Sequence, residues 1–130
     1  MIALTLVVID SSAWIEYLYQ FDKYKLAQKV IEDEKNTLVT PGIVAGEVIS
    51  KTTRQGLNAS IAEDAIKNLS ISASETQDDY FEAGKKHALL RKKDKSVSLA
   101  DAIILTIAER MNAKILTKDS HLKDPRTIML

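Results

Sequence analysis

The apolar residues of the chain fall into short continuous runs and into longer stretches with helical spacing. The first run, residues 4–9, is rich in β-branched side chains, as expected for a strand buried on both faces of a parallel sheet. Similar runs predict further strands at residues 36–40, 69–74 and 113–117 and near Ile128. Spacings of three and four residues predict helices from residue 12 and at residues 23–33, 41–53, 59–69, 76–90 and 98–111.

The alternation of strands with helices predicts an α/β fold. We expect a three-layer α/β/α domain in which a parallel sheet of about five strands is flanked by helices. No linker, repeat or low-complexity tract divides the 130 residues, so we expect a single domain over residues 1–130. In open sheets of this kind, binding sites form beyond the carboxyl ends of the strands. Asp10 and Asp119 follow two of the predicted strands and are therefore the first candidates for a site.

Polar residues at the predicted helix starts are expected to act as caps. Thr40 is predicted to cap the helix that has Pro41 in its first turn, and this helix should break at Gly56. The serines of the DSSAW segment can cap the helix that begins near Ser12, which leaves Asp10 free for another role. Asp10 could equally cap that helix itself, so its role stays open at this point.

Two further acids lie within predicted helices, and each has a structural alternative. Glu47 can pair with Lys51 at i,i+4, an interaction worth about 0.2–0.5 kcal/mol. Asp101 can form a capping box with Ser98. Asp101 also projects towards the apolar face of its helix, where an uncompensated carboxylate is costly. We therefore favour a functional role for Asp101 over a purely structural one.

The acids are more informative together than singly. Asp119 alone could cap a short turn, and His121 nearby could be a surface residue. Four converging carboxylates, however, would repel one another and raise each other's pKa unless a divalent cation held them. Oxygen ligands without cysteine favour Mg²⁺ or Mn²⁺ over Zn²⁺. Such a metal activates water and stabilises displacement at phosphorus, which indicates a metal-dependent phosphodiesterase.

The bulk composition excludes little. The chain has 18 Lys+Arg and 18 Asp+Glu, so its net charge does not indicate a polyanionic partner. It has no cysteine, which excludes a disulfide framework and a thiolate metal site and fits a cytoplasmic protein. The opening segment MIALTLVVI lacks a basic start and is too short to span a bilayer. We predict that it is the first strand, and we expect no membrane partner.

Three stretches resemble the acidic motifs of PIN-domain ribonucleases, and in particular the short VapC-type toxins of prokaryotic toxin–antitoxin pairs. They read VVIDSSAWIEYL, TPGIVAGEVISK and SLADAIILTIAERMNAKILTKDSHL. The resemblance covers essentially the whole chain, in order and at the usual intervals. Each motif is weak alone, whereas four acids in register are specific.

This resemblance implies a PIN-like fold and a metal-dependent endoribonuclease. Asp10, Glu47, Asp101 and Asp119 match the acidic quartet of the family, which binds Mg²⁺ or Mn²⁺, with Asp10 and Asp101 as the most direct ligands. Ser12 matches a position that supports the ligands by hydrogen bonding. Metal-activated water would cleave RNA and leave a 5′-phosphate and a 3′-hydroxyl.

The resemblance also implies protein partners. Members of the family usually form homodimers, and the toxins are blocked by a VapB-type antitoxin whose C-terminal segment covers the site. Aromatic residues in and just after the first motif could contribute to such a surface, because they are too closely spaced to be all core. They are Trp14, Tyr17, Tyr19 and Phe21. One departure is Leu122, where an aromatic residue is common, and it affects packing more than chemistry.

A basic run precedes the segment that contains Asp101. It could bind RNA phosphates near the metal, or it could be a solvated helix end and loop, and the sequence does not decide between the two. Its members are Lys85, Lys86, Arg91, Lys92, Lys93 and Lys95.

Three other functions compete with the nuclease. An aspartyl-phosphate hydrolase of the D-x-D type is disfavoured because residue 12 is serine. A phospho-acceptor receiver domain is disfavoured because the strand ending at Thr40 carries no aspartate. A catalytically silent PIN-fold scaffold for protein interactions is the remaining alternative, and the intact acidic quartet argues against it.

Overall fold

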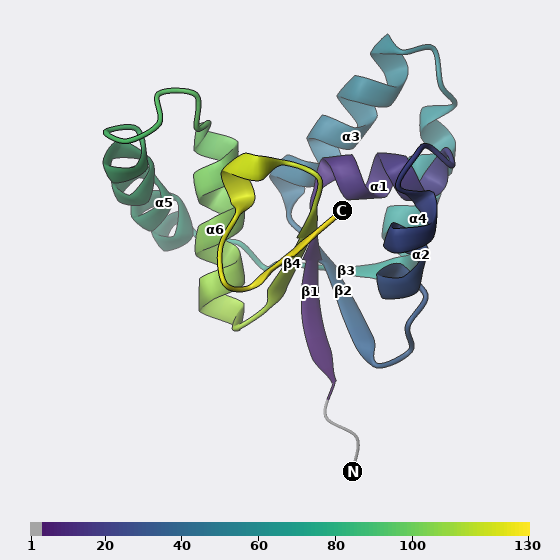
Figure 1. The fold of residues 1–130 in the computed structure, drawn as a ribbon, viewed down its shortest axis with the longest axis horizontal. Coiled ribbons are helices and arrows are strands. Elements are labelled where there is room, and N and C mark those ends of the chain that lie inside the picture. The colour runs from purple at the N-terminus through teal and green to yellow at the C-terminus, as the bar shows by residue number, and fades with distance from the viewer. Residues whose placement is uncertain (1–3) are drawn as a thin grey trace.

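A five-stranded parallel sheet forms the centre of the molecule in the computed structural model, which describes residues 4–130 (Figure 1). Its strands lie in the order β3-β2-β1-β4-β5, and every neighbouring pair is parallel. The strands are β1 (Thr5–Ile9), β2 (Asn36–Thr40), β3 (Ser70–Ser72), β4 (Lys114–Thr117) and β5 (Thr127–Met129). The predicted parallel sheet is therefore confirmed, whereas the part of the first-strand prediction that falls on residues 1–3 lies outside the described residues.

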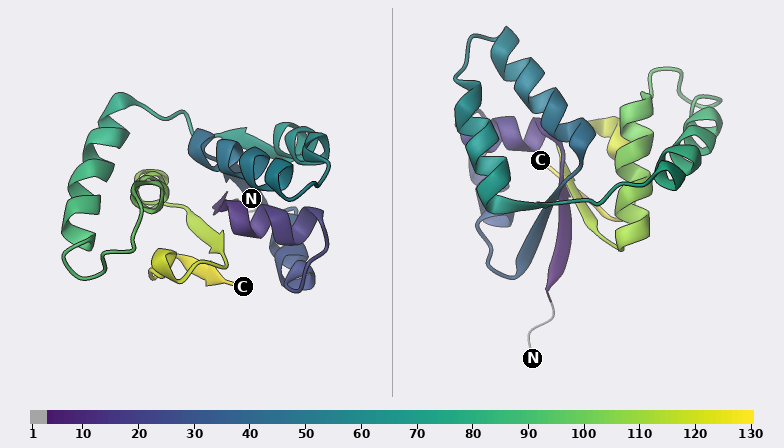
Figure 2. Two further views of the ribbon diagram at one scale, coloured as in Figure 1. Left: turned by 90° about the horizontal axis from the view of Figure 1, so that it is seen from above. Right: turned by 180° about the vertical axis from the view of Figure 1, so that it is seen from behind.

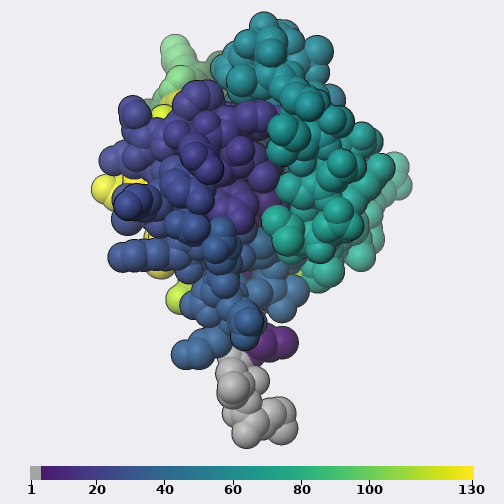
Figure 3. Space-filling model, turned by 90° about the vertical axis from the view of Figure 1, so that its right-hand side faces the viewer, coloured from purple at the N-terminus to yellow at the C-terminus, as the bar shows by residue number. Residues whose placement is uncertain are grey.

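Helices cover both faces of the sheet (Figure 2). The first four lie on one side, and the last two pack together on the other (Figure 1). They are α1 (Ser11–Leu18), α2 (Tyr24–Ile31), α3 (Gly42–Arg54), α4 (Ala59–Leu69), α5 (Gln77–Leu90) and α6 (Leu99–Met111), and a short 3₁₀ helix, η1 (Ser120–Leu122), follows β4. In the space-filling view, the segment of α1 (purple) packs against those of α3 and α4 (teal) (Figure 3). The predicted three-layer α/β/α arrangement is confirmed.

The strand order reverses direction at β1. After β1 the chain builds β2 and β3 on one side, then returns through α5 and α6 to place β4 on the other side. The pairing of Ile9 with Leu116, and the bond from Asp10 N to Leu116 O (3.0 Å), bring the ends of β1 and β4 side by side. Ligands of doubly wound sheets bind at such a switch point, because the adjoining loops diverge there to opposite faces.

The central strands end in fully buried residues. Val7, Val8 and Ile9 in β1, and Ile115 and Leu116 in β4, are all 0% exposed. Continuous apolar runs form such strands because helices cover both faces of a parallel sheet. The residues that follow these strands are thereby held on rigid supports.

Two predictions about helix caps were wrong. Pro41, not Thr40, occupies the cap position of α3, and no side chain caps that helix end. The Thr40 hydroxyl instead accepts a hydrogen bond from Trp14 Nε1 (3.1 Å) and is bonded to Ser70 Oγ (2.8 Å). Neither serine caps α1, because Asp10 occupies the cap position without a side-chain capping bond. These polar groups therefore hydrogen-bond residues distant in the sequence and do not cap their own helices.

The closely spaced aromatic residues are mostly engaged within the fold. Trp14 is 0% exposed, which excludes it from any surface. Tyr17 stacks on Tyr24 and donates to Glu32 Oε2 (2.8 Å). Among the four residues of the predicted aromatic surface, Phe21 is the one with a largely exposed side chain.

No helix within residues 4–130 has the length and hydrophobicity needed to cross a bilayer.

Candidate metal centre

Asp10 is held by tertiary hydrogen bonds at the end of β1. It is 5% exposed, and its Oδ2 accepts from Thr117 Oγ1 (2.8 Å) and from Ser12 Oγ (3.1 Å). Although Asp10 occupies the cap position of α1, its side chain makes no capping bond. The capping alternative is therefore not realised, because the carboxylate bonds the hydroxyls of Thr117 and Ser12 and not the helix amides.

Two hydroxyl groups join the end of β1 to the loop after β4. Thr117 Oγ1 accepts from the backbone N of Asp119 (2.9 Å), and Ser12 Oγ accepts from the backbone N of Lys118 (3.0 Å). Both hydroxyls also contact Asp10, and Thr117 is fully buried. The positions of Asp10 and Asp119 are therefore fixed relative to each other.

Asp101 forms the capping box and also faces the site. Ser98 N donates to Asp101 Oδ2 (2.9 Å), and Asp101 N donates to Ser98 Oγ (3.0 Å). The structural alternative to a functional role is thus realised, but it occupies only one carboxylate oxygen. Burial raises the pKa of Asp101, and the nearby charge of Asp119 adds to this rise. The hydrogen bonds with Ser98 lower the pKa but do not offset the rise.

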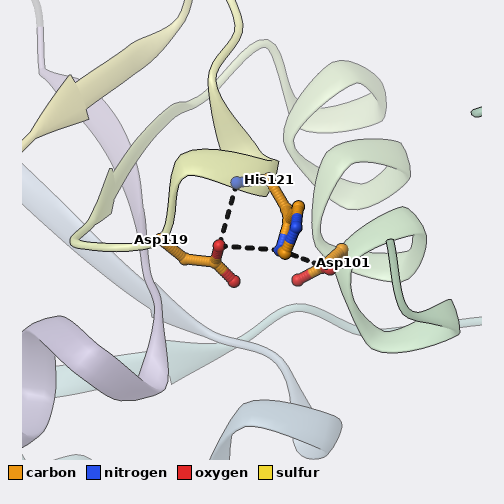
Figure 4. Close-up of side chains that lie close together, drawn as sticks. All are labelled: Asp101, Asp119 and His121. Atoms are coloured by element: carbon orange, nitrogen blue, oxygen red, sulfur yellow. Dashed lines mark hydrogen bonds and ion pairs between the residues drawn. The ribbon is translucent and has the colours of Figure 1, made fainter. Parts of the chain in front are cut away.

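A histidine joins the two aspartates at the mouth of the switch point. His121 Nδ1 lies 3.1 Å from Asp119 Oδ1 and 3.9 Å from Asp101 Oδ2. Figure 4 shows the imidazole between the two carboxylates, with Asp119 at the start of η1 and Asp101 at the start of α6. Donor atoms of the three residues all lie within 4.8 Å of one another, a spacing at which one cation can bind all of them.

The loop between α5 and α6 holds the other edge of the imidazole. His121 Nε2 is 2.8 Å from Ser96 Oγ and 3.5 Å from Asp94 Oδ2. A ring nitrogen held in this way fixes the orientation of the opposite nitrogen, as is common for metal-binding histidines. The orientation of His121 is therefore determined from two sides.

Glu47 lies midway along α3 and is half-buried. Burial raises the pKa of Glu47, the charge of Lys51 opposes this, and the charges of Asp10, Asp101 and Asp119 add to the rise. Lys51 Nζ donates to Ser11 Oγ (3.1 Å), and among residues 4–130 no ion pair within 4.0 Å joins Lys51 to Glu47. Glu47 therefore shares an electrostatic environment with the three aspartates.

The residues of the basic run lie in two different settings. Lys85 and Lys86, on α5, form ion pairs with Glu82 and Glu109, both at 3.1 Å. The remaining members are exposed in the loop whose Asp94 contacts His121, which places that loop beside the candidate centre. They are Arg91, Lys92, Lys93 and Lys95.

Sequence reasoning assigned no role to two residues of the centre. His121 fits a surface residue by sequence, although its place two positions after Asp119 in a tight turn is a usable signal. Thr117 fits a strand residue by sequence, although a hydroxyl that ends a buried strand can indicate a role at the site. Asp119 does cap the short turn, because its Oδ1 accepts from His121 N (2.9 Å).

The donor set fits a divalent cation. The close donors are Asp101, Asp119 and His121; Asp10 and Glu47 are not in this group within residues 4–130. Burial raises the pKa values of Glu47 and Asp101, and the charges of neighbouring acids add to the rise. Carboxylate oxygens suit Mg²⁺ and Mn²⁺, and Mn²⁺ also accepts an imidazole nitrogen. These residues are thus chemically able to hold either ion.

Solved structures of toxin proteins share this fold. VapC20 of Mycobacterium tuberculosis, described as a sarcin–ricin loop cleaving toxin, matches with a TM-score of 0.71 and 19% identity over 88% of this chain and 90% of that one. VapBC2 of Rickettsia felis, solved with a promoter DNA fragment, matches with a TM-score of 0.69 and 20% identity over 97% of this chain and 98% of that one. A toxin–antitoxin complex from Klebsiella pneumoniae matches with a TM-score of 0.66 and 18% identity over 95% of this chain and 96% of that one. At these identities, the likeness establishes the fold.

No curated protein matches the chain by sequence. The family profile described as "PIN domain", however, matches residues 7–127, a span that contains all four acids and His121. The chain belongs to the PIN domain family.

Proposed function

We propose that this protein is a metal-dependent endoribonuclease of the toxin–antitoxin type. The observation that carries the proposal is the convergence of Asp101, Asp119 and His121, whose donor atoms lie within 4.8 Å of one another at the switch point of the sheet. Asp10 is tied to Asp119 through Thr117, and Glu47 interacts electrostatically with all three aspartates.

The four acids would hold the cofactor, Mg²⁺ or Mn²⁺. When bound, the ion would supply a polarised water and stabilise negative charge on the reacting phosphate. Asp10 and Asp101 would be the most direct ligands, Asp119 and Glu47 would complete the set, and His121 would add a nitrogen donor. Ser12 orients Asp10 by donating to its Oδ2 (3.1 Å).

RNA is the proposed substrate. Exposed cations of the α5–α6 loop lie beside the centre and can bind phosphates of a strand that crosses it, because such contacts are electrostatic and independent of sequence. VapC20, which shares the fold, is described as a sarcin–ricin loop cleaving toxin. An antitoxin of the VapB type and a second copy of this chain are the proposed protein partners, in line with the fold shared with toxin–antitoxin complexes.

A cleavage assay tests the function. Purified protein is incubated with structured RNA in Mn²⁺, in Mg²⁺ and in EDTA, beside Asp101→Asn, which keeps an oxygen able to accept the capping bond from Ser98. Asp79→Asn is the matched control, because Asp79 forms the equivalent capping box with Thr76 at the start of α5. We expect cleavage by the wild type and by Asp79→Asn with metal, and none by Asp101→Asn or in EDTA.

The scaffold alternative makes the opposite prediction. A catalytically silent PIN fold would bind metal and partner without cleaving any RNA. Cleavage that persists in Asp101→Asn or in EDTA would contradict the proposed centre.

A further inference from the structure

A second recess opens beside the metal centre. It has a volume of about 310 Å³, at the lower end of the range of about 300–1,000 Å³ that is typical of small-molecule pockets. Its lining includes Ser12, Glu16, Phe21, Gln55, Lys118 and Asp119. Because Ser12 and Asp119 belong to both the recess and the candidate centre, a group bound here lies next to the reacting phosphate.

A buried carboxylate forms part of the recess wall. Glu16 is 4% exposed, and its Oε1 accepts from the backbone N of Lys23 (2.9 Å) and lies 3.5 Å from Lys118 Nζ. Its Oε2 has no hydrogen-bond partner among residues 4–130. Every fully buried side-chain oxygen in that range has a partner, so Oε2 is not fully buried. Oε2 is therefore open to the recess, where it can accept hydrogen bonds from a ligand.

The chemistry of the wall selects among nucleobases. An ionised carboxylate only accepts hydrogen bonds, and the adjacent Lys118 ammonium only donates them. Guanine alone has two neighbouring donors, N1–H and the N2 amino group, beside an acceptor, O6. Adenine and cytosine each place one donor next to an acceptor, and uracil has one donor between two acceptors. The exposed ring of Phe21 offers a surface for base stacking.

We infer that the recess binds an unpaired guanine of single-stranded RNA and that Glu16 determines this base preference; the inference rests on the proposed ribonuclease function. Glu16 Oε2 accepts from N1–H and the N2 amino group, and Lys118 Nζ donates to O6. Phe21 stacks on the base. The neighbouring phosphate then lies at the acidic centre, so cleavage occurs beside guanine.

Binding to short RNAs tests the inference without cleavage. Four labelled single-stranded oligonucleotides, identical except for a central G, A, C or U, are titrated into Asp101→Asn protein in Mg²⁺. We expect the G oligonucleotide to bind about tenfold tighter or more, the effect of a good two-bond base contact. Combining Asp101→Asn with Glu16→Gln should abolish this preference. The glutamine keeps an oxygen that accepts from Lys23 N, but it presents an NH₂ donor to the recess in place of the free carboxylate oxygen. Glu63→Gln, at an exposed position on α4, is the matched control and should retain it.

A second variant guards against misfolding of the buried Glu16 substitution. Lys118 is 47% exposed, so Lys118→Met should fold, and it should reduce the preference for G over A by removing the donor to O6. Equal affinity for the four RNAs, no RNA binding, or a preference unchanged by both variants overturns the inference. The inference is also overturned if Glu16→Gln loses binding to a protein partner but keeps the wild-type preference among the four RNAs, because the recess would then be a protein-binding site.

Wild-type cleavage distinguishes the two proposals. RNA cleavage without preference for guanine overturns the recess assignment and leaves the nuclease function intact. Guanine binding that depends on Glu16, without cleavage by the wild type in either metal, supports the recess and overturns the nuclease function.

Discussion

Thr117→Val tests whether the buried hydroxyl between Asp10 and Asp119 holds the candidate centre together. Valine has the same shape as threonine, so the substitution removes the hydroxyl and little else. Thr117 is 0% exposed, donates to Asp10 Oδ2 (2.8 Å) and accepts from Asp119 N (2.9 Å). Among residues 4–130, the Asp10 carboxylate would retain only its longer bond, from Ser12 Oγ (3.1 Å).

The expected loss of stability follows from these two bonds. A hydrogen bond to a charged group contributes about 1.5–3 kcal/mol, and a neutral one about 0.5–1.5 kcal/mol. The added methyl group recovers about 0.8 kcal/mol by burial. We expect the free energy of unfolding to fall by about 1–4 kcal/mol. RNA cleavage should fall about tenfold or more, as it does when a group that supports metal ligands is removed.

Denaturant unfolding followed by tryptophan fluorescence measures the effect. The chain has 1 tryptophan, and Trp14 is 0% exposed, so its emission reports on unfolding. Thr52→Val is the matched control, because Thr52 is also 0% exposed but its hydroxyl donates within its own helix, to Val48 O (2.7 Å) and Ile49 O (3.2 Å). The control should change the free energy of unfolding by less than about 0.5 kcal/mol, since such bonds add little to a helix. Equal losses in the two variants would refute the reasoning.

Two further predictions concern protonation. Burial raises the pKa of Glu47, with Asp10, Asp101 and Asp119 adding to the rise, so the folded chain holds this proton more tightly than the unfolded chain. The free energy of unfolding of the wild type in EDTA should therefore fall as pH rises from the ordinary carboxyl pKa through the raised pKa of Glu47. At neutral pH, Glu47→Gln should have a higher melting temperature than the wild type, and a lower one would contradict this. Burial and the bond to Glu32 raise the pKa of Tyr17 from 10.0 to about 12, so stability should fall between these pH values. Glu32→Gln should lower this pKa in an ultraviolet absorbance titration, and an unchanged titration curve would exclude Glu32 as a cause.

Much of the fold could be predicted because local patterns and tertiary packing agree. The helix expected at residues 59–69 is α4, Ala59–Leu69, with the same bounds. The break at Gly56 has a physical basis in its φ of +72°, a backbone conformation that glycine adopts without strain. The apolar run before Asp10 is typical of a strand covered on both faces, and an acid that follows such a strand lies at the carboxyl end of the sheet.

The caps show where local reasoning fails. A threonine before a proline-initiated helix is a reasonable cap by sequence, yet the Thr40 hydroxyl bonds Trp14, 26 positions before it, and Ser70, 30 positions after it. The Ser12 hydroxyl bonds the backbone of Lys118, 106 positions away. Spacing along the chain contains no information about partners of this kind.

By itself, the sequence determined the order of elements, the parallel sheet and the four acids, because hydrophobic periodicity and motif spacing are local properties. Only the tertiary structure decided that His121 lies between Asp101 and Asp119, that Thr117 joins Asp10 to the β4 loop, and that Glu16 presents a free oxygen to a recess. The physical reason is the reversal of strand order at β1, which brings the ends of two strands far apart in the sequence into hydrogen-bonding distance.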